Sequence, residues 1–229
     1  MAVISAGLVR NEADRWLHEF LAQARFLSDE VVILDDCSDD DTASICRQYA
    51  DEVIEADSPT FLVAEHQLRA RLWSAATKSA KRNDWILLFD ADELLAEVEQ
   101  DVLRDLLHNR RLPNLDSLSF RLLDMWSDTH FRHDHYWTAH LRQWVRAVRF
   151  DPTAQHRWPE MAQHCGSYPM GAEGVIGESG LSIRHMGWSR EGDRQAKFRR
   201  YMAADPTGEH GWLAQYESIL DPAPNLLEA

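Results

Sequence analysis

In the first part of the chain, short apolar runs alternate with longer segments in which apolar residues recur at helical spacing. The runs are rich in Val, Ile and Leu and end at Asp, Ser or Asn, which is typical of buried strands. They predict strands over residues 2–9, 30–34, 51–56 and 85–89. The segments between them predict helices over residues 11–27, 42–50 and 66–81. This alternation favours a parallel, doubly wound sheet with helices on both faces.

The later part of the chain shows a different pattern. It begins with an amphipathic helical segment, followed by a predicted strand over 117–123. Residues 141–150 alternate between apolar and polar side chains, which favours an antiparallel strand. The glycine-rich segment 171–180 predicts a flexible loop, and the short strand after it is predicted to end at His185. The tail from Asp205 predicts short helices and turns.

These patterns predict an α/β fold with a mostly parallel sheet and a small antiparallel extension. The chain has 229 residues, of which 45% are hydrophobic, so it is long enough to bury one sizeable core. We expect a single domain over residues 1–204, with a first half of about 1–95 and a second half of about 96–204. Residues 205–229 are expected to form a C-terminal tail.

The charge distribution limits the possible partners. The formal net charge is −14, which argues against nucleic acid as a partner over most of the surface. Eleven carboxylates and one arginine lie between Asp29 and Asp57. These acids either form a solvated face or gather around a cation or a hydrogen-bond donor, and charge alone leaves both alternatives open.

The sequence also bears on the cellular compartment. No apolar run approaches the roughly 20 residues of a membrane helix, so no transmembrane segment is expected. The N-terminal segment becomes charged too early for a signal peptide. The three cysteines show no metal-ligand spacing, which favours a reduced, cytoplasmic compartment.

The segment W-I-L-L-F-D-A-D-E-L-L ends an apolar run on Asp90, Asp92 and Glu93. In the same way, Asp35 and Asp36 follow the second predicted strand. Because the carboxyl ends of parallel strands meet at one edge of a sheet, where ligands bind, these acids are expected to share a rim. Two carboxylates one residue apart suit a hard divalent cation. Without a cation, such a pair is expected to suffer like-charge repulsion.

Four segments in this order resemble a known family. They are R-N-E at 10–12, D-D-C-S-D-D-D-T at 35–42, F-D-A-D-E at 89–93 and R-H-M-G-W at 184–188. The chain resembles family 2 glycosyltransferases with the A-type nucleotide-sugar fold, in particular bacterial members whose last metal ligand is the His of an H-x-G-W segment. Cys37 stands where these proteins usually have Gly, which implies a turn that does not demand positive φ.

The resemblance implies an inverting, metal-dependent transfer of a sugar from a nucleoside-diphosphate donor to a hydroxyl of a carbohydrate or glycoconjugate. A UDP-sugar is the favoured donor. The first half of the domain would bind the nucleotide, and the second half would bind the acceptor. The residues implied in the nucleotide pocket are Asn11, Glu12, Asp35, Asp36, Asp90 and either Arg71 or Arg69.

The resemblance also implies a metal site. Asp92 would bind the metal directly, His185 would complete the site, and Asp90 would hold either the ribose or the metal. The expected ion is Mn²⁺ or Mg²⁺, bridging the two donor phosphates. A histidine among oxygen ligands favours Mn²⁺, because imidazole suits Mg²⁺ poorly.

An inverting transfer needs a base that takes the proton of the acceptor hydroxyl. The family often supplies it between the metal motif and the last His, but the usual E-D pair is absent from this sequence. Glu160 is the first candidate, on the expectation that partial burial beside Trp158 raises its pKa. Asp134 is the second candidate, and Asp124 and His164 also remain open.

Three further segments have two interpretations each. Most of the nine tryptophans are expected in the core, but Trp126, Trp137 and Trp188 are candidates for the acceptor side. The His-rich segment 130–140 lacks the defined fourfold ligand set of a zinc site, which favours an acceptor-side loop. The segment K-F-R-R-Y at 197–201 either contacts donor phosphates or forms a solvated helix face.

Other functions compete with the transferase. In a haloacid-dehalogenase-type phosphatase Asp90 would attack phosphorus and Asp92 would be the acid, but that motif normally closes the first strand. A nucleotidyltransferase would need a Gly-rich, basic first loop, which A-G-L-V-R-N-E is not. A non-catalytic carbohydrate-binding relic of the transferase fold would be free to lose Asp92 or His185, and both are present.

Overall fold

The computed structural model describes residues 1–108, 112, 114–161, 165–209 and 211–229. In chain order, its strands are β1 (Val3–Val9), β2 (Glu30–Asp35), β3 (Glu52–Glu55), β4 (Trp85–Leu87), β5 (Glu93–Leu94), β6 (Ser117–Asp124), β7 (His130–Arg132), β8 (Gln143–Arg149), β9 (Ile176–His185) and β10 (Leu226–Glu228). The α-helices are α1 (Leu17–Leu27), α2 (Thr42–Cys46), α3 (Phe61–Ala76), α4 (Glu97–His108), α5 (Glu191–Ala204) and α6 (Leu213–Ser218). Short 3₁₀ helices span Ala139–Leu141 and Met186–Trp188.

The described strands form one eight-stranded sheet in the order β3-β2-β1-β4-β8-β6-β9-β5, and a two-stranded sheet of β10 and β7. Strands β1 to β4 are mutually parallel where they pair, as the alternating pattern of the first half predicts. Strand β8 runs antiparallel to both β4 and β6, while β9 is parallel to β6 and antiparallel to β5. The predicted fold class, a parallel doubly wound half with an antiparallel extension, is confirmed.

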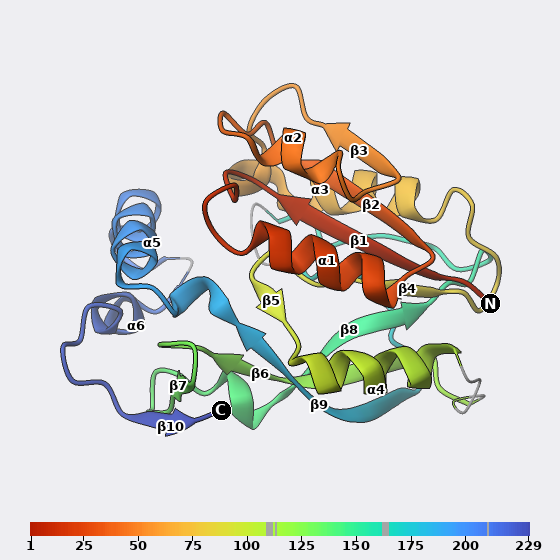
Figure 1. Cartoon of the computed structure of the whole chain (residues 1–229). Coiled ribbons are helices and arrows are strands. Elements are labelled where there is room, and N and C mark those ends of the chain that lie inside the picture. Colours follow the sequence, from red (N-terminus) through yellow and green to blue (C-terminus); the bar gives the residue numbers. More distant parts are fainter. Residues whose placement is uncertain (109–111, 113, 162–164, 210) are drawn as a thin grey trace.

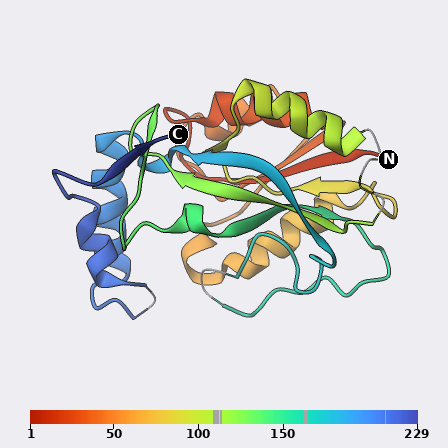
Figure 2. The same ribbon diagram turned by 90° about the horizontal axis from the view of Figure 1, so that it is seen from below.

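Helices cover both faces of the sheet (Figures 1 and 2). Helices α1, α2 and α4 pack on one face, and α3 packs on the other. Two apolar clusters separated by the sheet result from this arrangement. Strand β1 is buried at every position because it lies in the middle of this parallel region, which explains its continuous apolar sequence.

Helix α5 lies beyond the carboxyl ends of the parallel strands (Figure 1). Arg190, which immediately precedes α5, donates a hydrogen bond to the carbonyl of Asp14 in the loop after β1. Asp193 of α5 lies 3.3 Å from Arg15 of the same loop. The helix therefore borders the rim on which the sequence places the acidic residues.

The predicted helix over 11–27 is shorter in the structure, since α1 begins at Leu17. Asn11 has a φ of +51°, and the carbonyl of Glu12 accepts a hydrogen bond from the amide of Arg15 in a turn. A left-handed residue does not continue a right-handed helix. The chain uses these residues to place Glu12 and Arg15 at the rim instead.

The expectation for Cys37 is wrong. Its φ is +59°, so the turn after β2 does adopt the left-handed conformation that the usual glycine would favour. The turn is held by Asp35, whose carboxylate accepts hydrogen bonds from the amide and the hydroxyl of Ser38. These local bonds stabilise a conformation that costs a residue with a Cβ roughly 1–2 kcal/mol.

The predicted flexible loop over 171–180 is also wrong in its second half, because β9 begins at Ile176. A Cβ on Gly177 would lie 2.3 Å from Leu115, so this glycine permits close packing rather than flexibility. Gly180 has a φ of +76° and lies in the bulge where the register of β9 against β6 shifts. The glycines therefore serve the bend of a long strand.

The tail contains a strand as well as the predicted helix and turns. Strand β10 pairs with β7, aligning Leu227 with Phe131. Helix α6 packs against α5. Within the described residues, no helix is both long enough and apolar enough to cross a membrane.

Candidate active site

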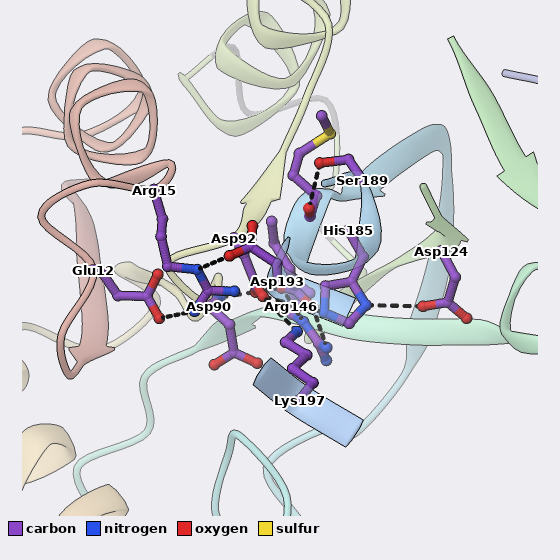
Figure 3. Close-up of polar contacts among 12 residues, drawn as sticks. Glu12, Arg15, Asp90, Asp92, Asp124, Arg146, His185, Ser189, Asp193 and Lys197 are labelled. Carbon is purple, nitrogen blue, oxygen red and sulfur yellow. Dashed lines mark hydrogen bonds and ion pairs between the residues drawn. The ribbon is translucent and has the colours of Figure 1, made fainter. Parts of the chain in front are cut away.

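Asp90 and Asp92 lie in the turn between β4 and β5. Two buried residues, Leu88 and Phe89, carry the chain out of the core, and the amide of Glu93 then closes a turn on the carbonyl of Asp90. Strand β5 pairs Glu93 with His185 of β9. This short pairing places Asp92 beside His185 although the two are far apart in the sequence (Figure 3).

His185 lies between two carboxylates. Its Nε2 atom is 3.4 Å from Asp92 Oδ2, and its Nδ1 atom is 2.8 Å from Asp124 Oδ1. The register of β6 and β9 aligns Asp124 with His185 and thereby fixes this second contact. Burial lowers the pKa of His185, but Asp92 and Asp124 outweigh it and raise the pKa to about 10. The imidazole is therefore protonated in the protein alone.

Each carboxylate of the D-A-D-E segment has its own basic partner. Asp92 pairs with Lys197 at 3.2 Å, and Asp90 pairs with Arg69 at 3.2 Å. Glu93 makes two contacts with Arg146, at 2.6 and 2.7 Å. The basic partners come from three different elements: α5, α3 and β8. The like-charge repulsion expected without a cation is therefore offset in the folded protein, because each acid contacts a basic side chain.

Burial would raise the pKa of Asp92, but Lys197 and His185 hold it well below its usual range. The carboxylate is therefore ionised at neutral pH. Burial alone would lower the pKa of Arg146, but the Glu93 carboxylate raises it, so the guanidinium stays charged inside the protein. Glu93 Oε2 also accepts a hydrogen bond from the amide of Asp90. The buried pair thus holds the turn that carries Asp90 and Asp92.

Of the two arginines considered for the nucleotide, Arg69 contacts the D-A-D-E turn, whereas Arg71 contacts the carboxyl end of β3. Arg69 is buried and contacts both Glu65 and Asp90. Burial would lower the pKa of Arg69, but Asp90 and Glu65 raise it. Arg71 is exposed and donates a hydrogen bond to the carbonyl of Glu55, the register partner of Asp35 at the end of β3.

The acids after β2 are engaged by the protein itself. Asp36 accepts hydrogen bonds from the amides of Thr60 and Phe61 at the start of α3, and it lies 3.5 Å from Arg10. Asp35 holds Ser38, as described above. Asn11 accepts a hydrogen bond from the amide of Asp39 and binds the same acidic turn from the other side. Hydrogen bonds thus link Asn11, Ser38 and Asp35 in one loop cluster next to the rim, while Asp36, the next residue in the chain, holds the start of α3.

Glu12 is half-buried, and one of its two carboxylate oxygens has no hydrogen-bond partner among the described residues. Its Oε1 accepts a hydrogen bond from Arg15, whereas its Oε2 is buried and has no hydrogen-bond partner among the described residues. Burial raises the pKa of Glu12 to about 7, against the lowering effect of Arg15 and with a further rise from Asp92. The side chain is thus half-protonated near neutral pH and offers a hydrogen-bonding group to a ligand.

Because its folded-state pKa is raised, Glu12 should make stability fall as the pH rises. Between pH 4.5, the ordinary pKa, and about pH 7, the folded-state pKa, Glu12 is ionised in the unfolded chain but still protonated in the folded one. The free energy of unfolding therefore falls by about 3 kcal/mol over this pH range. We expect Glu12→Gln to unfold at the same urea concentration as the parent at pH 4. At pH 8 its free energy of unfolding should be about 3 kcal/mol higher, because the pKa of about 7 already includes the favourable contact with Arg15.

The matched control is Glu19→Gln, which makes the same change at an exposed position of α1. Urea unfolding of the three proteins at pH 4, 6 and 8 gives the comparison. An equal effect of Glu12→Gln at all three pH values would show that the Glu12 carboxyl titrates alike in the folded and unfolded chains.

Asp92 and His185 fit a divalent cation. Asp124 holds Nδ1 of His185, so Nε2 is the nitrogen directed at Asp92, and it is the nitrogen that a metal would use. Asp90 is one third exposed on the same turn. Within the described residues, no group of three His, Cys, Asp or Glu side chains is close enough to hold a metal unaided. The donor set therefore suits an ion that takes further oxygen ligands from a substrate.

The candidate bases lie in different surroundings. Glu160 is exposed, so the expected partial burial is wrong, although Trp158 beside it is buried. Asp134 accepts hydrogen bonds from Arg132 and from the amides of Tyr136 and Trp137, which gives it a structural role in this loop; these contacts occupy both of its oxygens. Asp124 is engaged by His185. His164 lies outside the described residues.

Trp126, Trp137 and Trp188 come together in one cluster near His185. Trp188 stacks on Trp126 with an interplanar angle of 15°, and Trp137 meets both rings edge-on. Next to them is a cavity of about 180 Å³. Its lining is mainly aromatic and includes Trp137, Trp188, Tyr201, Trp212, Tyr216 and Gln215. Trp126 lies behind this lining and does not face the cavity.

Several residues of the site were not singled out from the sequence. Arg146, Arg15 and Asp193 were missed, and Lys197 was only one letter of a basic segment. A charged residue at the centre of an alternating strand, as Arg146 is in β8, was an available signal. For Lys197 no such signal exists, because it lies on an otherwise exposed polar helix.

The parallel half with its acidic rim and the antiparallel extension match an A-type glycosyltransferase fold. The profile of Glycosyl transferase family 2 matches residues 9–148. The chain therefore belongs to glycosyl transferase family 2.

The fold is also similar to a solved structure. This is a mannosyltransferase from Pyrobaculum calidifontis, determined in complex with GDP-Man and Mn²⁺. The TM-score is 0.50 at 15% sequence identity, over 97% of this chain and 65% of that chain. The likeness concerns the fold.

Two curated relatives are uncharacterized proteins of Mycobacterium bovis and Mycobacterium tuberculosis. Each is 26% identical to this chain over 227 residues, covering 92% of the chain and 52% of the relative. The chain thus spans about half the length of the curated relatives it matches.

Proposed function

We propose that this chain is an inverting, metal-dependent glycosyltransferase. It would move a sugar from a nucleoside-diphosphate donor to a hydroxyl of a carbohydrate or glycoconjugate acceptor. The observation that supports this most directly is the arrangement of Asp92, His185 and Asp124 at the rim of the sheet. Family membership and the position of D-A-D after an interior strand argue against the phosphatase alternative.

Asp92 and His185 would hold the metal, with Asp90 on the more exposed side of the same turn. When bound, the ion supplies positive charge against the diphosphate that leaves. Mn²⁺ is favoured over Mg²⁺, since the ligands include imidazole. Mn²⁺ is also the ion named in the P. calidifontis complex. The task of the protein is to keep Nε2 of His185 turned towards Asp92, which Asp124 achieves.

The nucleotide would lie along the loop cluster after β1 and β2. Glu12 offers its unpartnered Oε2, and Arg69 places a guanidinium beside Asp90. Asp35, Asp36 and Asn11 shape the turn. Arg71 remains the alternative arginine, since it contacts the end of β3 next to Asp35.

The donor is tested by thermal stabilisation with nucleotide sugars. A UDP-sugar is our expectation from the motifs, and GDP-mannose is the necessary comparison because the P. calidifontis protein binds GDP-Man. At 100 times the dissociation constant a ligand stabilises the folded state by about 2.7 kcal/mol. We expect this shift with Mn²⁺ and a smaller one in EDTA. If no nucleotide sugar or nucleoside diphosphate shifts the melting temperature, the transferase proposal is contradicted.

The aromatic cavity is a suitable acceptor site. Trp188 contributes to its wall and lies at a ring-centroid distance of 5.9 Å from His185, so an occupant would lie next to the metal site. Aromatic faces bind the apolar faces of sugar rings, while their edges and Gln215 add polar contacts. Trp126 supports Trp188 from behind by stacking.

Glu160 stays our predicted base. Its exposure makes it accessible to an acceptor hydroxyl, unlike Asp134, whose oxygens bind Arg132 and the loop backbone. We expect Glu160→Gln to lower sugar transfer by about 10²-fold, the usual scale for a lost general base. Binding of the nucleoside diphosphate should change little, since Glu160 would not contact it. Product formation and calorimetric binding measure the two effects separately.

The comparison variant is Asp134→Asn. Because Asp134 holds a loop, we expect it to lower the melting temperature by several degrees, about 1–2 kcal/mol. Normal transfer by Glu160→Gln, with slow transfer by an Asp134→Asn protein of unchanged stability, would assign the base to Asp134. A non-catalytic relic would instead bind nucleoside diphosphate without transferring or hydrolysing any sugar.

A further inference from the structure

We propose that Lys197 is a diphosphate-binding residue, whose ammonium neutralises Asp92 in the free protein and contacts the donor diphosphate when a cation binds Asp92. The inference rests on the proposed transferase function and deepens it. The residue comes from α5, which borders the rim (Figure 3).

Lys197 is buried on a helix that is otherwise exposed or half-buried. Its exposed fraction is 7%, and it is the buried residue of α5. Lysine is rarely buried unless it is paired. Here the ammonium lies 3.2 Å from Asp92 Oδ2 and 4.2 Å from the centre of the Trp188 ring. A carboxylate and an aromatic face together hold the charge inside the site.

The chain also leaves space for this ammonium. A Cβ on Gly187 would lie 2.1 Å from Lys197 Nζ and 2.1 Å from Asp92 Oδ2. A Cβ at this position would overlap both charged groups, so at least one of them would have to move. The glycine of the H-x-G-W segment therefore allows the contact between Lys197 and Asp92.

Unlike the other basic groups of the rim, Lys197 would lose its acidic partner if a cation bound Asp92. Arg146 makes two contacts with Glu93, and Arg69 is shared between Glu65 and Asp90. Within the described part of the chain, the acid at ion-pair distance from Lys197 is Asp92 alone. A divalent ion on Asp92 would take this partner away and repel the ammonium.

The displaced ammonium then has a new anion within reach. The diphosphate would bind to the same cation, and the flexible four-carbon stem of lysine lets the ammonium turn while the helix stays in place. Charge-assisted hydrogen bonds to phosphate oxygens would replace the bond to Asp92. Lys197 would thus add a positive charge on the leaving-group side, in addition to the charge of the metal.

The test is calorimetric binding of UDP and GDP, each in Mn²⁺ and in EDTA. Lys197→Met keeps the length and apolar stem but removes the charge. We expect it to weaken nucleoside diphosphate binding by about tenfold or more in Mn²⁺, as for loss of a charge-assisted bond, and by clearly less in EDTA, where Asp92 holds the ammonium. Arg199→Met is the matched control, because it removes a charge from an exposed position of the same helix. It should change binding less than threefold.

A second pair of variants tests the role of Lys197 even if the Lys197→Met protein does not fold. Asp92→Asn frees Lys197 of its partner, so this variant should bind nucleoside diphosphate in EDTA more tightly than the parent. Adding Lys197→Met should remove the gain, and this double variant contains no unpaired Asp92 carboxylate. A gain that survives in the double variant would overturn the role of Lys197.

The outcomes distinguish this inference from the proposed function. If the parent binds nucleoside diphosphate with Mn²⁺ and Lys197→Met binds it equally well, Lys197 only balances the charge of Asp92. The transferase proposal would then stand without the inference. If the parent binds no nucleoside diphosphate in either buffer, both are overturned.

Discussion

Replacing Asp92 by Asn is expected to lower sugar transfer by about 10³-fold or more, since a catalytic metal contributes several kcal/mol to transition-state stabilisation. Mn²⁺-dependent binding of the donor should be lost at the same time. The reason is geometric: Asp92 Oδ2 faces Nε2 of His185 at 3.4 Å, so the change removes the carboxylate from the proposed ligand pair. Release of nucleoside diphosphate measures the effect.

The same variant should be less stable than the parent in the absence of metal. Asp92 pairs with Lys197 and with His185, and its pKa is held well below its usual range despite burial. Asparagine would leave an imidazolium and an ammonium close together without an anion between them. We expect a loss of about 2 kcal/mol, or about 4–8 °C in melting temperature.

Asp101→Asn is the control for this experiment, because it makes the same chemical change at an exposed position of α4. Near-ultraviolet circular dichroism establishes whether each variant keeps its packing. Full transfer activity in a folded Asp92→Asn protein would contradict the metal site, and with it the assignment of His185 as a ligand.

The parallel half could be predicted because its signals are local. Each strand is a continuous apolar run, each ends on polar residues, and helical periodicity separates one from the next. The rim followed from the same pattern, since carboxyl ends of parallel strands share an edge. Asp35 and Val9 are indeed register partners, and Asp90 follows the neighbouring β4.

The glycine-rich segment and the turn after β2 could not be predicted, because their conformations depend on contacts between residues that are distant in the sequence. Gly177 and Gly180 suggested a flexible loop, because sequence alone does not show that one packs against Leu115 and the other allows a bulge. Cys37 adopts a positive φ because the surrounding hydrogen bonds outweigh its local preference. Tertiary context overrides propensity in both cases.

The basic partners of the acids were hidden for the same reason. Arg146, Arg69 and Lys197 come from separate elements and meet the D-A-D-E turn only in the folded chain. From the sequence alone, the turn looked like a cluster that needed a metal for its stability. The folded protein neutralises each acid by itself, and the metal in our proposal serves the substrate.

Arg146→Met is expected to cause the largest loss of stability among the variants considered. Glu93 and Arg146 are both buried, and their two contacts leave Glu93 without a charged partner when the guanidinium is removed. Breaking a buried pair from one side costs about 3–5 kcal/mol, because an uncompensated charge remains. For a chain of this length, we expect the melting temperature to fall by about 10 °C.

Removing both charges should restore most of this stability, since apolar or neutral replacements of a buried ion pair are often close to neutral. Two double variants separate stability from positioning. In Glu93→Gln/Arg146→Met, the Gln side chain still has an oxygen that accepts the hydrogen bond from the amide of Asp90. In Glu93→Leu/Arg146→Met, that acceptor is gone.

We therefore expect both double variants to melt within a few degrees of the parent, at about 1–2 kcal/mol of lost stability. Only Glu93→Gln/Arg146→Met should keep transfer activity within about tenfold of the parent, because a lost hydrogen bond at the turn would shift the groups that we propose as metal ligands. Equal activity in the two double variants would show that the pair stabilises the core without positioning Asp90 and Asp92. A melting temperature unchanged by Arg146→Met would show that Glu93 accepts its burial without the guanidinium.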